Sequence, residues 1–124
     1  IDTVTYMKRY DYLESQEAAM EIKRYNKLVR DKIPDIIEQT GKFCTIEILS
    51  DEDYLKMIDA KLDEELMEYH QDQNIEELAD LMEVIYAATE ARGYSIEELE
   101  RVRREKVKER GAFKGKILLR EVEQ

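Results

Sequence analysis

The stretch from residue 75 to residue 91 constrains the fold most, because it is apolar over most of a helical circumference. Asn74 is a favourable N-cap residue directly before it, and Gly93 follows two residues after its end. A helix with so much apolar surface must be covered by other helices. We therefore expect this helix to be the most buried element of the chain.

Two amphipathic helices flank this central one. Ser50 is the expected N-cap of a helix over residues 51–70, and Ser95 begins a third helix that runs to about residue 109, before Gly111. Basic residues are concentrated in the C-terminal half of the third helix, where their positive charge interacts favourably with the helix dipole. The apolar stripe of the first helix is centred on Leu55, Leu62, Leu66 and Tyr69.

Shorter elements are expected at the two ends of the chain. A loose apolar stripe predicts a helix over residues 6–23, and Pro34 suits the first turn of a short helix that Gly41 can end. Apolar and β-branched residues predict short strands over 43–49 and 117–122, which can pair with each other. The predicted fold is all-α, with these two strands at its periphery.

Composition agrees with one helical domain. The chain has 124 residues with only four Gly and one Pro, and we divide it into an N-terminal helical extension, 1–24, and a domain over 25–124. A net charge of −10 argues against nucleic acid polymers and anionic membranes as partners. The single Cys44, and the lack of an apolar run long enough for a signal peptide or a membrane span, lead us to expect a cytoplasmic protein.

Two carboxylates of the central helix lie on its apolar side, away from the face that is expected to meet solvent. The expected solvent face of this helix carries Glu76, Glu83 and Glu90. Glu77 and Asp80 instead lie on either side of Val84, on an apolar face where an unpaired charge is costly to desolvate. These two side chains therefore need a partner.

The helical register supplies that partner. If the first two long helices form a tight antiparallel pair that turns between Asp72 and Gln73, Glu65 faces Asp80 and Glu68 faces Glu77. Glu65 lies about 60° from the centre of its apolar stripe. No basic residue within this pairing neutralises the four acids, and like charges about 4 Å apart repel by roughly 1–4 kcal/mol. We expect a divalent cation between them, and all-oxygen ligands favour Mg²⁺ or Mn²⁺.

Two interpretations remain open from the residues alone. With 30 acidic residues in the chain, acidic pairs at helical spacing also arise by chance on solvated surfaces. The four acids can therefore belong to a hydrolytic metal site. Alternatively, they can belong to a non-enzymatic helical module that docks a basic partner or only binds divalent ions.

Four short motifs resemble one known family. Residues 64–68 match the pattern EExxE and residues 77–80 match ExxD, both typical of the all-α nucleotide pyrophosphohydrolases called MazG-like. The opening YNKLVRDKIP at 25–34 and RGAF at 110–113 resemble the branch of that family called phosphoribosyl-ATP pyrophosphohydrolase-like. The resemblance covers roughly residues 25–122.

The resemblance implies a reaction and a ligand set. The enzyme would cleave a nucleoside triphosphate or a related nucleotide between the α and β phosphates, releasing pyrophosphate and a monophosphate. Its metal ligands would be Glu65, Glu68, Glu77 and Asp80. Only eight residues separate Glu68 from Glu77, fewer than is usual in the family, so a base-binding element of the family is expected to be missing there. Phosphoribosyl-ATP itself is an alternative substrate.

Supporting roles follow from the chemistry of phosphate hydrolysis. Glu64, next to the ligand set, is our candidate for orienting or deprotonating the attacking water. Fixed positive charge for the phosphates can come from three clusters, which the spacing cannot rank: Lys61; Lys27, Arg30 and Lys32; and Lys106, Arg110 and Lys114. Lys61, four residues before Glu65, can also form a simple ion pair along the helix.

An oligomer is expected from the amount of apolar surface. Three helices, one of them apolar nearly all round, cannot shield themselves well in a single copy. MazG-like proteins commonly build their bundle from two or more chains, so we expect a homodimer or a homotetramer. A basic tail of one subunit could then reach the acidic site of another.

Overall fold

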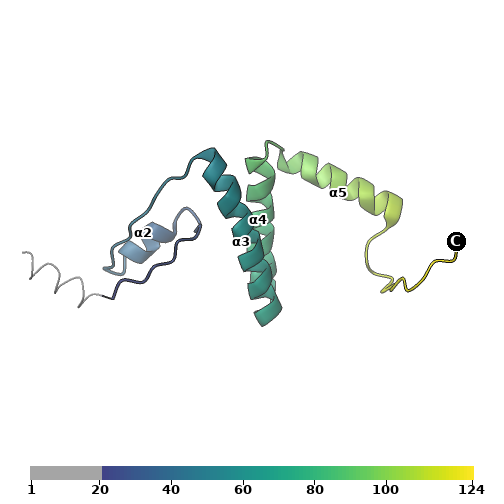
Figure 1. The fold of residues 1–124 in the computed structure, drawn as a ribbon, viewed down its shortest axis with the longest axis horizontal. Helices are drawn as coiled ribbons and strands as arrows, with labels where there is room; N and C mark the ends of the chain where they lie inside the picture. Colours follow the sequence, from purple (N-terminus) through teal and green to yellow (C-terminus); the bar gives the residue numbers. More distant parts are fainter. Residues whose placement is uncertain (1–20) are drawn as a thin grey trace, which may run out of the picture.

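The computed structural model describes residues 21–124, and the helix predicted over 6–23 lies almost wholly outside this part of the chain. The described residues form helices and no strand, which confirms the all-α class. The helices are α2 (Ile33–Glu38), α3 (Asp51–Asp72), α4 (Ile75–Ala91) and α5 (Ile96–Arg110) (Figure 1). None of them is long and apolar enough to cross a membrane.

Each long helix begins where the sequence predicts. The Ser50 side-chain oxygen accepts a hydrogen bond from the backbone N–H of Asp53 at 3.2 Å. At the start of α4, Oδ1 of Asn74 accepts one from the backbone N–H of Glu77 at 3.0 Å. Ser95 begins α5 with a complete capping box. These caps satisfy N–H groups that a helix end otherwise leaves without a partner, so they fix where the helices start.

Helices α3 and α4 form a tight antiparallel pair, which we call the acidic hairpin (residues 51–91). Gln73 adopts a left-handed conformation, with φ of 51°, and its N–H bonds the carbonyl of Tyr69 at 2.7 Å. The chain therefore reverses within two residues, as the predicted register requires. The buried side chains at the contact are Ile58, Val84 and Glu65.

The buried face of α3 differs from the predicted stripe. Leu66, which we placed at the stripe's centre, is 43% exposed, whereas Ile58 and Glu65 are the buried residues of this helix. The helix is rotated because α4 packs on the side that contains Ile58 and Glu65 and nothing else in the described chain covers Leu66. Glu65 consequently lies within the helix contact rather than at its boundary.

In a single copy, helix α4 is less buried than we expect for a helix that is apolar over most of its circumference. Only Val84 is buried in α4, although the helix is apolar nearly all round. Helix α3 covers one side of it, and the other side keeps an exposed apolar stripe. That stripe consists of Ile75, Leu78, Met82 and Ile85.

The two predicted strands are also wrong, because residues 43–49 and 117–122 are both without regular structure. Their positions give the reason. Residues 43–49 run from α2 to α3 at one end of the molecule, whereas residues 117–122 lie beyond α5 at the other end (Figure 1). A strand needs a neighbour for its backbone N–H and C=O groups, and neither segment has one within the described chain.

Helix α5 projects away from the acidic hairpin. It contacts α4 near the short turn that joins them, and its far end lies well away from α3 (Figure 1). Gly111 ends α5 at φ of 83°, a conformation that side-chain-bearing residues rarely adopt. The chain then continues as a largely extended tail.

Candidate metal centre

Carboxylates from both helices of the acidic hairpin meet in the groove between them. One oxygen from each of Glu65, Glu77 and Asp80 lies within 4.8 Å of the others, and Glu64, Glu65 and Glu68 form a second such set. Glu68 also neighbours Glu77 across the pair. The structure therefore brings together the four acids that the register predicts.

The local sequence explains this convergence. Glu65 and Glu68 are three residues apart on α3, and Glu77 and Asp80 are three apart on α4, so each pair projects from successive turns of one helix. The two-residue turn after Asp72 then sets the pairs opposite each other.

Two oxygen atoms of this cluster lack a hydrogen-bond partner. Glu65 is only 6% exposed, and its Oε2, like Oε2 of Glu77, is buried without a partner among residues 21–124. A buried carboxylate oxygen left unpaired is costly, so these atoms fit a site that binds a cation. An all-oxygen set suits Mg²⁺ or Mn²⁺ better than Zn²⁺.

The cluster raises the affinity of its own acids for protons. Burial raises the pKa of Glu65, and the neighbouring Glu68 adds to this, while Lys61 opposes it. The pKa of Glu77 is raised by desolvation and by the negative charges of Asp72, Asp80 and Glu65. Both pKa shifts arise first from desolvation and then from the neighbouring carboxylates of the cluster.

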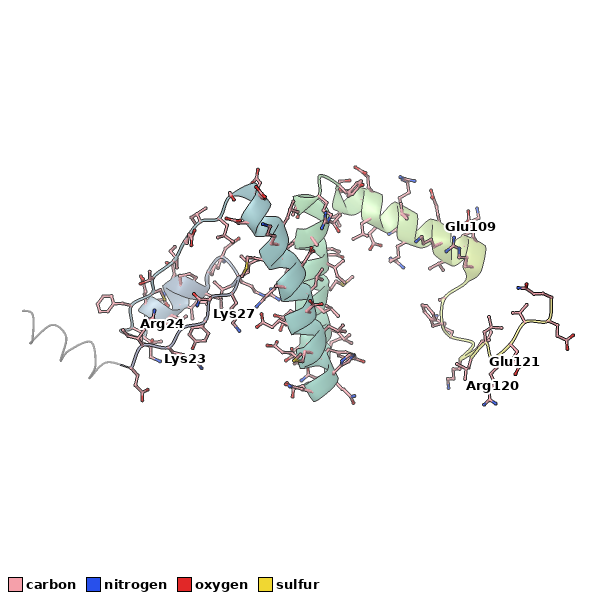
Figure 2. All side chains as sticks on the ribbon, in the orientation of Figure 1. Lys23, Arg24, Lys27, Glu109, Arg120 and Glu121 are labelled. Carbon is pink, nitrogen blue, oxygen red and sulfur yellow. The ribbon has the colours of Figure 1, made fainter. Side chains whose placement is uncertain are left out.

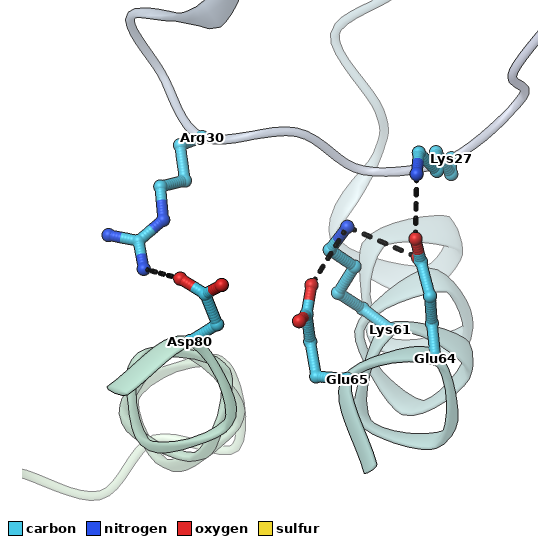
Figure 3. Close-up of polar contacts among 6 residues, drawn as sticks. All are labelled: Lys27, Arg30, Lys61, Glu64, Glu65 and Asp80. Atoms are coloured by element: carbon cyan, nitrogen blue, oxygen red, sulfur yellow. Dashed lines mark hydrogen bonds and ion pairs between the residues drawn. The ribbon is translucent and has the colours of Figure 1, made fainter. Parts of the chain in front are cut away.

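Partial neutralisation nevertheless comes from two basic residues, which corrects our expectation that none serves this pairing. Lys61 Nζ lies 3.3 Å from Oε1 of Glu65, and Arg30 Nη2 lies 2.6 Å from Oδ1 of Asp80 (Figure 3). The ion pair between Lys61 and Glu65 along the helix was one of our two interpretations of Lys61. The Arg30 contact reaches the cluster from the chain before α2.

Glu64 is held by two lysines on the outer side of the cluster. Lys27 Nζ donates to its Oε1 at 2.7 Å and Lys61 Nζ to its Oε2 at 3.1 Å (Figure 3). Burial alone would raise the pKa of Glu64, but these two hydrogen bonds lower it below its usual value. Glu64 is therefore ionised near neutral pH, as a group that accepts a proton must be.

The candidate phosphate-binding residues fall into two groups. Lys27, Arg30 and Lys61 all contact acids of the cluster, and Figure 3 shows the segment that carries Lys27 and Arg30 passing over both helices. Lys106 and Arg110 lie instead on the distal half of α5, away from the groove (Figure 1). The sequence carries no local signal for the Arg30 contact, because Arg30 and Asp80 are 50 positions apart in the chain.

Comparisons with known proteins add little to the geometry. A relative from Mycolicibacterium smegmatis (strain ATCC 700084 / mc(2)155), described only as an uncharacterized protein, is 51% identical over 41 residues. The match covers 33% of this chain and 42% of the relative, so the chain spans less than half the length of the curated relative it matches. No family model matches the chain, and no solved structure matches it.

Proposed function

We propose that this protein is a metal-dependent nucleotide pyrophosphohydrolase of the MazG-like type. It would hydrolyse a nucleoside triphosphate or a related nucleotide between the α and β phosphates. The observation that carries the proposal is the Oε2 atom of Glu65, which has no hydrogen-bond partner among the described residues. Glu65 is only 6% exposed and lies among four converging carboxylates. The resemblance of residues 64–68, 77–80 and 25–34 to this family supplies the reaction.

The residues of the site would have different roles in the reaction. Glu65, Glu68, Glu77 and Asp80 would hold Mg²⁺ or Mn²⁺. The bound ion would neutralise phosphate charge and make a coordinated water more acidic. Glu64, which is ionised near neutral pH, would orient the attacking water and accept its proton.

The three nearby cations would bind the polyphosphate. Lys27, Arg30 and Lys61 now pair with carboxylates, and each could transfer to a phosphate oxygen once those carboxylates bind the metal. Such an exchange replaces one charge-assisted hydrogen bond by another, so its net cost is small. It would also release Glu64 from the two lysines that now occupy its oxygens.

The direct test is a panel of nucleotides incubated with the purified protein and Mg²⁺ or Mn²⁺, with products separated by chromatography. We expect pyrophosphate and a monophosphate in equal amounts, and no product with a chelator present. Including phosphoribosyl-ATP beside ordinary triphosphates identifies the substrate class. If no nucleotide is turned over with either metal, the proposal is wrong.

A second candidate is an acidic module that docks a basic partner, and one observation favours it. The groove already binds a basic segment of its own chain through Lys27 and Arg30. Under this alternative, metal would bind without hydrolysis. A short peptide copying residues 25–34 would then compete with the metal, and nucleotide would not.

An oligomer, either a homodimer or a homotetramer, is part of the proposal. The exposed stripe on α4, made by Leu78, Met82 and Ile85, is a surface that a second copy would cover. In such an assembly Lys106 and Arg110 of one copy could approach the acidic hairpin of another. Either residue would then add positive charge for the substrate.

A further inference from the structure

Two short segments carry apolar side chains that the described chain leaves almost fully in solvent. In residues 43–49, Phe43 is 96% exposed and Ile48 is 88% exposed. In residues 117–122, Ile117 is 88% exposed and Leu118 is 77% exposed. Apolar groups exposed to this degree, in two runs of six or seven residues, indicate surfaces that are covered in the working protein.

The two segments suit each other as strands. The first segment is rich in β-branched and aromatic residues, and the second begins with Ile117 and ends with Val122, both of which favour strands. Their lengths of seven and six residues are close to those of common strands. Each also has backbone N–H and C=O groups free for a neighbour, because neither belongs to a helix or a sheet. An exposed extended segment of this kind is a template for pairing with another.

Within one chain the segments are far apart. Arg120 and Glu121, in the second segment, lie at the opposite side of the molecule from Lys23 and Lys27, which neighbour α2 and the first segment (Figure 2). Helix α5 would have to leave its place beside α4 for the two to meet. A second copy can bring them together while α5 keeps its place beside α4.

The distribution of charge also favours a second copy of this chain as the partner. Residues 101–120, which we call the basic arm, hold nine basic and two acidic side chains, whereas the acidic hairpin holds 14 acidic and two basic ones. The basic arm projects away from the acidic hairpin of its own chain (Figure 1). Two copies placed with arm against hairpin attract each other, and two-fold symmetry would give that attraction twice.

We propose that two copies of this chain associate by exchanging tails. Residues 117–122 of each copy pair, strand to strand, with residues 43–49 of the other. The exchange gives a symmetric dimer with two equivalent two-stranded ribbons, each next to α2. This surface does not depend on the proposed hydrolysis, although it would carry each basic arm toward the other copy's groove.

The single Cys44 makes the test direct, because it lies within the first segment. Wild-type chain is mixed with isotope-labelled chain in which Cys44→Ser is combined with one new cysteine, placed in turn at each position from 117 to 122. After mild oxidation, mass spectrometry detects the labelled–unlabelled disulfide. We expect it at alternate positions only, because side chains of a strand alternate between its two faces.

A matched control carries Cys44→Ser with Glu109→Cys, an exposed position on α5 outside both segments, and should give no mixed disulfide. Light scattering should show the wild type as a dimer that salt weakens, and Ile117→Lys with Leu119→Lys should be a monomer with unchanged helix content. A monomeric wild type, or crosslinking that is absent or equal at all six positions, would overturn the proposal. Neither measurement uses nucleotide or metal, so this outcome is separate from that of the hydrolysis assay.

Discussion

The acidic hairpin and the basic arm contrast in packing as well as in charge. In the acidic hairpin, two helices meet along their length and bury Ile58, Val84 and Glu65. Helix α5, whose C-terminal part belongs to the basic arm, has no buried side chain and contacts α4 near the turn between them. Stability within one copy therefore comes from the hairpin, and the arm is free to serve an intermolecular role.

The contrast is informative because the hairpin buries an acid in its centre. An apolar residue in place of Glu65 would pack as well and avoid the desolvation of a carboxylate. The basic arm carries its charges on the surface, where each costs little to solvate. A costly charge in the packed hairpin indicates function, whereas a charge that costs little on a projecting helix is compatible with several roles.

The largest expected effect is on catalysis by the acidic hairpin. Glu65→Gln or Asp80→Asn should each lower kcat/KM at least about 100-fold, because losing a metal ligand exceeds the 10- to 100-fold cost typical of losing its supporting groups. Glu83→Gln, on the solvent face of α4, is the matched control and should keep full activity. Turnover that is the same in all four proteins would remove the cluster from the mechanism.

Metal should stabilise the hairpin even without substrate. At a free Mn²⁺ concentration 100 times its Kd, the free energy of unfolding should rise by about 2.7 kcal/mol. For a folded domain of about 100 residues, that corresponds to an increase in Tm of roughly 10–20 °C, which circular dichroism at 222 nm measures. A chelator should reverse the increase. Glu65→Gln should abolish most of it, and if this variant is stabilised as much as the wild type, the ion binds elsewhere.

The fold of the hairpin was predictable because its signals are local. Ser50, Asn74 and Ser95 set the helix starts through caps that depend on a residue and its near neighbours. The meeting of Glu65 with Asp80 followed from the helix period and a short turn. Both are properties of a few consecutive residues, so they could be predicted without knowing the rest of the fold.

The features that could not be predicted from the sequence depend on contacts between residues that are far apart in the chain or lie in another copy. The strands at 43–49 and 117–122 have the right composition, but strand formation needs a neighbour that one copy does not provide. The face of α3 was misplaced because Leu66 and Ile58 are equally apolar, and only the position of α4 decides which is covered. The Arg30 contact with Asp80 likewise joins segments with no shared sequence pattern.

The pH dependence of stability should show whether Glu65 is placed to bind a cation or to serve packing and its ion pair with Lys61. Its pKa is higher in the folded, metal-free protein than in the unfolded chain, so the fold binds the proton more tightly. The stability contributed by that proton is present below the unfolded pKa and is lost as pH rises through the raised folded pKa.

Without metal, Glu65→Gln should therefore be more stable than the wild type near pH 7, and this advantage should shrink as pH falls below the unfolded pKa. With saturating Mn²⁺ the order at pH 7 should reverse. Melting curves across pH, with Glu83→Gln as the control, measure both effects. A variant less stable than the metal-free wild type at pH 7 would show that Glu65 serves packing and its ion pair with Lys61 rather than a cation.

The smallest effect concerns Arg30, the cation that now neutralises Asp80. Because Arg30 is 57% exposed, its 2.6 Å ion pair is worth at most about 1 kcal/mol, as is usual at a surface. A metal that takes Asp80 as a ligand must displace this contact, so Arg30→Gln should tighten Mn²⁺ binding without nucleotide by about two- to fivefold.

Arg92→Gln is the matched control, because Arg92, directly after α4, pairs with Asp59 of α3 at 3.3 Å and outside the cluster. It should leave Mn²⁺ affinity unchanged in a calorimetric titration. If Arg30 instead binds phosphate after it leaves Asp80, Arg30→Gln should also raise KM for the nucleotide while metal binding tightens. Weaker Mn²⁺ binding in Arg30→Gln would mean that Arg30 orients Asp80 for the ion, so that the basic segment completes the acidic hairpin rather than competing with the metal.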